Sequence, residues 1–218
     1  MTKPNLDISF VSDVACPWCA IGLASLESAL ERLGGDVQAS IQVEPFELNP
    51  DMGPEGTELV PYIARKYGRS PAQIAQTQAM IRERGAEVGF SFGERKHVWN
   101  TFNAHRLLHW ATLEGRALEL KRALLQAYHG EGRNPGDPDV LVALAEKVGL
   151  DPVRARAIVD SDEFAAEVRE RERFWVEQGV NGVPLVVIDN TYAISGAQSP
   201  EVFEEGLRRI ARAKLPQS

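Results

Sequence analysis

Long apolar runs and blocks of basic residues are both missing from this sequence. No run approaches the length that spans a membrane, and residues 1–7 lack the apolar core of a signal peptide. The formal net charge is −7, from 31 acidic and 24 basic residues, which disfavours nucleic acid as a partner. We therefore expect a cytoplasmic protein with neither a membrane nor a nucleic acid among its partners.

Cysteine is also scarce, since the 218 residues contain only Cys16 and Cys19. Two cysteines scattered at random would have this separation roughly once in a hundred placements. In a reducing cytoplasm such a pair indicates a catalytic dithiol better than a structural one. Two inert, buried thiols are the alternative, because free cysteine packs as a small hydrophobe. Burial explains neither the spacing nor the Pro17 between the two cysteines.

The sequence around the two cysteines predicts a strand that leads into a dithiol at the start of a helix. Residues 6–12 have strand character, and 17–33 carry apolar residues at helical spacing before Gly34 ends the helix. Free N–H groups at a helix N-terminus stabilise a thiolate, and proline fits the first turn without losing a helix hydrogen bond. Cys16 is therefore the expected exposed nucleophile. Cys19, one turn deeper, is the thiol expected to resolve a mixed disulfide.

The remaining pattern predicts an α/β chain in which helices separate two strand-containing ends. A second strand at 39–46 completes a βαβ unit, and strands at 184–188 and 191–194 precede a final helix that opens at Ser199. The helices expected in between lie at 57–67, 71–88, 99–114, 116–130, 138–148, 152–159 and 162–178. We expect one unit made of residues 1–55 with 180–218, and an inserted, all-helical domain at 56–179.

The histidines and a charged run in the helical segment favour structural over functional roles. His105 and His109 have the i, i+4 spacing of metal ligands, but no third ligand and no zinc-protease glutamate accompany them, so we expect no metal site. His97 and His129 are expected at the surface. Residues 167–173 alternate in charge sign, which predicts a solvated helix face.

Four separated motifs, in this order, resemble the DsbA-like branch of the thioredoxin fold. They are SDVACPWCAIG at 12–22, PFELNP at 45–50, NTFNAHRL at 100–107, and GVP at 182–184 followed by YAISGAQ at 192–198. The resemblance covers essentially the whole chain and is closer to the FrnE-like thiol oxidoreductases associated with polyketide biosynthesis. It implies a thioredoxin fold (βαβ…ββα) with a large helical domain inserted between the two halves. The second redox pair of some relatives is absent, because no cysteine lies near the C-terminus.

The resemblance implies a thiol–disulfide oxidoreductase that uses the dithiol of Cys16 and Cys19 for catalysis. It also implies a cis Val183–Pro184 peptide bond beside this dithiol, where the Val183 backbone pairs with an extended substrate segment. The residues expected to bind substrate are Pro17, Trp18, Val183 and Pro184. Protein or small-molecule thiols and disulfides are the expected partners, and the oligomeric state is left open.

The same resemblance suggests two residues that could support the dithiol and a possible small-molecule reductant. His105 lies in a family-like segment, where it either faces the dithiol or only braces helices, and the two roles have equal weight. Gln198, at the opening of the last helix, is a second supporting candidate. No cofactor is expected to stay bound, and glutathione is a candidate reductant or ligand.

Two other functions are compatible with this architecture. One is a glutathione-dependent transferase or isomerase of the kappa-class or hydroxychromene-carboxylate isomerase type. Those proteins typically offer a serine where this chain has Cys16 and would not need Cys19, so the cysteine pair disfavours this function. The other is a non-enzymatic chaperone that holds peptides in the groove, which a thiol-independent activity in a double cysteine variant would favour.

Overall fold

The structure is a computed structural model that describes residues 3–215, and its elements follow the predicted order. Strands and helices in chain order are β1 (Asn5–Ser12), α1 (Pro17–Leu33), β2 (Gln38–Pro45), β3 (Thr57–Glu58), α2 (Leu59–Tyr67), α3 (Pro71–Glu87), β4 (His97–Val98), α4 (Phe102–Leu113), α5 (Ala117–Leu125), α6 (Pro138–Lys147), α7 (Pro152–Val159), α8 (Ala165–Glu177), β5 (Leu185–Ile188), β6 (Tyr192–Ser195) and α9 (Pro200–Ala213). A 3-10 turn, Gly34–Asp36, follows α1, and a π turn, Gln126–Gly130, follows α5.

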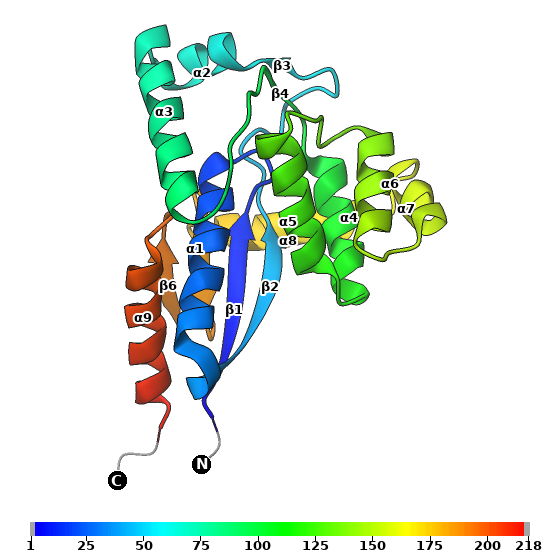
Figure 1. Cartoon of the computed structure of the whole chain (residues 1–218). Helices are drawn as coiled ribbons and strands as arrows, with labels where there is room; N and C mark the ends of the chain where they lie inside the picture. The colour runs from blue at the N-terminus through cyan, green and yellow to red at the C-terminus, as the bar shows by residue number, and fades with distance from the viewer. Residues whose placement is uncertain (1–2, 216–218) are drawn as a thin grey trace.

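The central sheet joins the two ends of the chain. Its strand order is β2-β1-β5-β6, with β1 parallel to β2 and antiparallel to β5, and β5 antiparallel to β6. Ile8 in the middle of β1 lies opposite Ile41 of β2 and Ile188 of β5. The helices between β2 and β5 rise above and beside this sheet (Figure 1). This is the thioredoxin arrangement with an insertion between its halves, as the resemblance implied.

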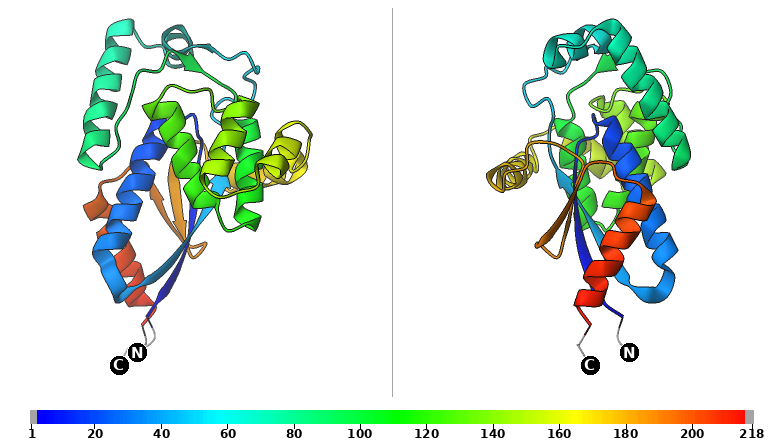
Figure 2. Two further views of the ribbon diagram at one scale, coloured as in Figure 1. Left: turned by 45° about the vertical axis from the view of Figure 1, so that its right-hand side comes forward. Right: turned by 90° about the vertical axis from the view of Figure 1, so that its left-hand side faces the viewer.

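One face of the sheet packs against α1 and α9. Alternate β1 residues Leu6, Ile8 and Phe10 are buried on that face and meet Phe203 and Leu207 of α9 in one apolar core. Helix α8 lies on the opposite side of the sheet (Figure 2). In the described part of the chain, no helix combines the length and the apolar character needed to cross a membrane.

The inserted segment has a core of its own and a separate arm. Buried leucines and isoleucines of α4, α5, α6 and α7 form the core, with members such as Leu107, Leu124 and Ile158. Helices α2 and α3 lie with β3 and β4 above the end of α1 that carries Cys16 (Figure 1). The antiparallel β3–β4 pair corrects the prediction of an all-helical insertion. Each strand has two residues, which is too short to produce an alternating pattern in the sequence.

Most side chains of the charged run in α8, residues 167–173, are exposed as its alternating signs predict, but some of its charges also hold the helix to the sheet. Arg171 forms a two-pronged ion pair with Glu44 at 2.8 and 3.0 Å, and Arg169 pairs with Glu47 and with Glu172. Glu44 and Glu47 lie at and just beyond the end of β2, so α8 is fastened to the sheet through its charges. A tertiary partner of opposite charge cannot be inferred from the pattern of one helix, so these contacts were not predicted.

Raising the pH from about 5 to about 8 should destabilise the wild type more than a Glu47→Gln variant. Burial, followed by the nearby Glu172, raises the pKa of Glu47 to about 7, although Arg169 opposes the shift. Between an ordinary pKa of 4.5 and about 7 the folded protein holds a proton that the unfolded chain has lost, so the free energy of unfolding falls as pH rises. The effect is at most about 3 kcal/mol before solvent screening at the half-exposed Arg169. Urea unfolding at both pH values checks it, and equal declines in the two proteins would contradict it.

Candidate active site

The two cysteines lie at the N-terminal end of α1, where the strand-to-helix pattern predicted them. Cys16 is the N-cap, with extended backbone angles (φ −88°, ψ 115°), and Pro17 is the first helical residue. The Cys19 N–H donates to the Cys16 carbonyl at 3.1 Å, which closes the first turn. Both cysteines are free, so the structure is that of the dithiol.

Cys16 is buried, contrary to the expectation of an exposed nucleophile. It is only 3% exposed and Cys19 is fully covered. The reason is tertiary: α2 and α3 lie over this end of α1, and the Val183 carbonyl contacts the sulfur from the other side. Cys16, Pro17 and Trp18 instead line a cavity of about 390 Å³ beneath the two helices.

The two thiols have opposite acid–base properties. A hydrogen bond from the Cys19 thiol holds the pKa of Cys16 below its usual range, with help from the Cys19 and Trp18 N–H groups, although burial and the Asp13 charge oppose the shift. Burial raises the pKa of Cys19 well above its usual range, and the Cys16 sulfur adds to the increase. The negative charge of the pair is therefore favoured on Cys16 and the proton on Cys19.

The segment before β5 meets the dithiol. The Val183–Pro184 peptide bond is cis, as the resemblance implied, and the Cys16 Sγ lies 3.6 Å from the Val183 carbonyl oxygen, to which it donates when Cys16 is protonated. Pro184 packs on Gly22 of α1 so closely that a Cβ at Gly22 would lie 2.9 Å from its Cγ. Glycine at position 22 is therefore what lets the proline ring sit against the helix one turn beyond the dithiol.

A Gly22→Ala variant should be less stable than the wild type by about 1–3 kcal/mol, because the added methyl group overlaps the rigid Pro184 ring. Thermal unfolding measures the loss, and thiol exchange should slow as the Val183 carbonyl moves away from Cys16. The matched control is Gly206→Ala in α9, where the new Cβ would meet only the flexible end of Ile194. Because alanine favours helix, that variant should keep or gain stability. Equal stability of the two variants would contradict the packing argument.

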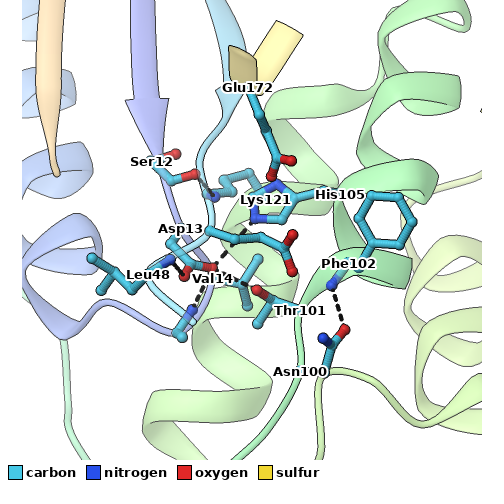
Figure 3. A network of polar contacts seen from close by, with 12 residues as sticks. Ser12, Asp13, Val14, Leu48, Asn100, Thr101, Phe102, His105, Lys121 and Glu172 are labelled. Atoms are coloured by element: carbon cyan, nitrogen blue, oxygen red, sulfur yellow. Dashed lines mark hydrogen bonds and ion pairs between the residues drawn. The ribbon is translucent and has the colours of Figure 1, made fainter. Parts of the chain in front are cut away.

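A buried carboxylate, Asp13, lies between β1 and the dithiol and joins three separate parts of the chain (Figure 3). It accepts hydrogen bonds from the Ala15 N–H at 3.0 Å, the Leu48 N–H at 2.7 Å and the Thr101 hydroxyl at 2.8 Å, and it contacts His105 Nε2 at 3.3 Å. Burial acts to raise the pKa of Asp13, but His105, followed by the Leu48 and Ala15 N–H groups, outweighs burial and holds the pKa below its usual range. The carboxylate is therefore charged and fixes the loop that carries Cys16.

His105 and Lys121 complete this buried polar cluster. His105 touches Asp13 rather than either sulfur, so it supports the dithiol loop through the carboxylate. Lys121 is fully buried, and its Nζ donates to the Ser12 carbonyl at 3.4 Å. Burial lowers the pKa of Lys121, while Cys19, followed by Asp13, opposes the shift. Negative charge on the dithiol or on Asp13 therefore favours the protonated form of Lys121.

Sequence reasoning assigned no role to Asp13 or Lys121, although one signal for the lysine exists. Lys121 falls on the stripe of α5 formed by Ala117, Leu120 and Leu124, where a helix normally buries apolar residues. A charged residue on such a stripe indicates a buried partner. For Asp13 the sequence contains no comparable signal except its position directly after the strand and before the dithiol.

The remaining sequence candidates lie away from the sulfurs or in unexpected places. His129 was predicted at the surface but is fully buried, with Nε2 donating to the Val14 carbonyl at 2.8 Å. It sits in the π turn after α5, which adds a residue to the turn and changes the face on which a side chain lies. His97 is exposed, as predicted, and His109 packs against Phe164. Gln198 donates to the Ser195 carbonyl, and no polar contact joins it to either cysteine within residues 3–215.

A dithiol at the entrance of the first helix, beside a cis proline of a thioredoxin-type sheet, defines the class of thioredoxin-fold dithiol proteins. The sequence profile of the DSBA-like thioredoxin domain family matches residues 7–208. The chain belongs to this family.

Individual relatives agree with the assignment. The chain is 30% identical over 206 residues to the uncharacterized protein YwbO of Bacillus subtilis, covering 93% of this chain and 96% of that one. It is similar to the crystal structure of the probable DsbA oxidoreductase SCO1869 from Streptomyces coelicolor, with 32% identity, a TM-score of 0.90 and coverage of 98% and 92%. A 2-hydroxychromene-2-carboxylate isomerase shares the fold at 18% identity, with a TM-score of 0.73 and coverage of 95% and 97%.

Proposed function

We propose that the chain is a thiol–disulfide oxidoreductase of the FrnE-like subgroup, in which Cys16 attacks and Cys19 resolves. The observation that carries the proposal is the geometry of the dithiol, in which Cys16 is the N-cap of α1 and reaches a cavity while Cys19 lies one turn deeper and fully covered. An enzyme of this kind needs one ionised sulfur to begin exchange and a second, protonated one in reserve. The similarity to the Streptomyces protein that is described as a probable DsbA oxidoreductase supports the same class.

The exchange starts from the dithiol form of the protein. The Cys16 thiolate attacks one sulfur of a substrate disulfide, the substrate S–S bond breaks, and the other sulfur leaves and takes up a proton. Cys19 then gives up its proton and attacks the Cys16 sulfur, which releases the second substrate thiol and leaves a Cys16–Cys19 disulfide. The substrate gains two electrons and two protons; the enzyme loses two electrons, the proton of Cys19 and the proton that Cys16 released to solvent when it ionised. The reverse sequence oxidises a substrate dithiol.

The residues around the Cys16 sulfur are proposed to position the substrate. The Val183 carbonyl already contacts the Cys16 sulfur, and the Val183 N–H donates to no group within residues 3–215, so it is free to donate to a bound substrate. Pro184 fixes this backbone against α1. Pro17 and Trp18 offer apolar surface in the cavity beside Cys16.

Residues 56–179 are proposed to act as a lid on the unit formed by 1–55 and 180–218. The position of α2 and α3 over the dithiol end of α1 supports this role (Figure 1). The proposed setting is the cytoplasm, where glutathione or a protein dithiol would return the disulfide to the reduced form. Neither a permanent cofactor nor a nucleic acid or membrane partner is part of the proposal.

Equilibration with glutathione buffers of graded redox ratio tests the function. Alkylation of the remaining thiols and intact-mass analysis should reveal a single transition between a dithiol and an internal Cys16–Cys19 disulfide. The midpoint should lie between the values of about −270 mV for thioredoxin and about −120 mV for DsbA. If no internal disulfide forms at any ratio, the oxidoreductase proposal fails. Glutathione-dependent isomerisation that survives loss of Cys19 would favour the alternative function.

A further inference from the structure

We propose that the cavity beside Cys16 binds a small aromatic or otherwise apolar disulfide that carries a carboxylate, and that such a molecule, rather than a protein, is the redox substrate. The inference rests on the proposed function and names its substrate class. The cavity lies between the dithiol end of α1 on one side and the arm formed by α2, α3 and β4 on the other.

The depth of the sulfur favours a small substrate. Cys16 is 3% exposed and Cys19 is fully covered, so a disulfide on the surface of a folded protein cannot reach them in this conformation. The cavity of about 390 Å³ does reach Cys16, Pro17 and Trp18. This volume is near the lower end of the range of about 300–1,000 Å³ that is typical of small-molecule sites.

The walls of the cavity are mainly apolar and aromatic. Leu59, Ile63, Ile74, Ile81 and Val98 form the aliphatic part, and the rings of Trp18 and Tyr62 add two flat surfaces. Flat rings of this kind pack well against an aromatic ligand. A polar peptide backbone would make few apolar contacts with these walls. A ligand with an apolar or aromatic group therefore fits the cavity better.

The charges around the cavity are of one sign. Although the chain has a net charge of −7, no aspartate or glutamate lines the cavity, whereas Arg69 and Arg95 do. Arg95 lies over the Tyr128 ring, 5.0 Å from its centre. Within residues 3–215 neither arginine forms an ion pair with a carboxylate, in contrast to cavity-remote arginines such as Arg122. An unpaired guanidinium at an apolar cavity matches a ligand carboxylate.

The reaction follows the exchange already described. Cys16 attacks the nearer sulfur of the bound aromatic disulfide, one aromatic thiol leaves, and Cys19 releases the second as the internal disulfide forms. One substrate disulfide therefore becomes two thiols while the enzyme dithiol is oxidised. An aromatic thiolate is a good leaving group because its pKa is low.

Stopped-flow oxidation of the reduced protein by four disulfides tests the inference. The probes are dithiobis(nitrobenzoate), which is aromatic and anionic, dithiodipyridine, which is aromatic and neutral, cystamine, which is aliphatic and cationic, and insulin. Each rate is divided by the rate of the same probe with free dithiothreitol, which removes intrinsic reactivity. We expect the anionic aromatic probe to be fastest and insulin slowest. Arg95→Gln should reduce the preference for the anionic over the neutral aromatic probe about tenfold, as expected for loss of one charge-assisted hydrogen bond.

A second pair of variants tests the cavity without changing its charge. Thr77 lines the cavity from α3 and is exposed, so Thr77→Trp should fill the space and slow both aromatic probes about tenfold. Gln76→Trp, one residue earlier and outside the cavity, should match the wild type. Insulin reacting as fast as the aromatic probes, or unchanged rates in Arg95→Gln and Thr77→Trp, would overturn the substrate assignment. Failure of every probe to oxidise the wild-type dithiol would instead overturn the proposed function.

Discussion

Replacing Cys16 with serine should reduce disulfide exchange to the uncatalysed background, whereas replacing Cys19 with serine should leave a protein that accumulates mixed disulfides. The Cys16 sulfur is the one whose pKa is lowered, by the Cys19 thiol in the first place, so its loss removes the nucleophile. Without Cys19 the first exchange still takes place, but nothing within the site releases the bound substrate thiol. The two variants should therefore fail in different ways.

Mass spectrometry after incubation with a disulfide distinguishes the variants. The Cys19→Ser protein should carry one adduct at Cys16, and the Cys16→Ser protein should carry almost none. Limiting iodoacetamide on the reduced wild type should label Cys16 first. Predominant labelling of Cys19, or stable adducts on the Cys16→Ser protein, would reverse the roles assigned to the two sulfurs.

An Asp13→Asn variant should lose about 3–5 kcal/mol of unfolding free energy, because a buried network built around a carboxylate would be broken. The carboxylate faces donors from Ala15, Leu48 and Thr101, and an asparagine NH₂ group would confront at least one of them with a second donor. The buried Lys121 would also lose a nearby negative charge. Urea unfolding measures the loss, and Asp7→Asn, at an exposed position of the strand that precedes Asp13, is the control expected to stay within about 0.5 kcal/mol.

The Asp13→Asn variant should also differ from the wild type in the pH dependence of its stability and in the pKa of Cys16. Since the folded pKa of Asp13 lies below its usual 3.8, the carboxylate stabilises the fold above that pH, and this contribution disappears as the pH falls through the folded pKa. The wild type and the variant should therefore converge in stability at acid pH. The Asp13 charge opposes the lowering of the Cys16 pKa, so its removal should lower that pKa further. A stable variant with an unchanged thiol pKa would show that Asp13 is dispensable.

Local patterns predicted most of the secondary structure because their signals lie within a few residues. Ser70, Asp137 and Asp151 each precede a proline at the first helical position, and each side chain accepts from backbone N–H groups of its helix. The strand before Cys16 and the helix after it are equally local. Where an element departs from regular helix, as in the π turn that buries His129, the expected face was wrong.

The polar cluster under the dithiol could not be predicted in this way. Asp13 meets Leu48, Thr101 and His105, which are 35, 88 and 92 residues away in sequence. No periodicity relates residues that only the folded chain brings together. The burial of Cys16 has the same origin, since it depends on an arm whose two short strands left no pattern.

The order in which the chain is synthesised adds a consequence to the contact between Cys16 and Val183. These residues are separated by 167 positions, and β1 finds its antiparallel neighbour β5 only near the end of the sequence. At ordinary translation rates of about 5–20 residues per second, both thiols leave the ribosome roughly 8–33 s before the carbonyl that will contact one of them. The nascent chain therefore displays both cysteines long before the Val183 carbonyl can cover Cys16. A growing chain arrested before β5 should react with a large disulfide such as insulin faster than the finished chain does, because Val183 does not yet contact the Cys16 sulfur.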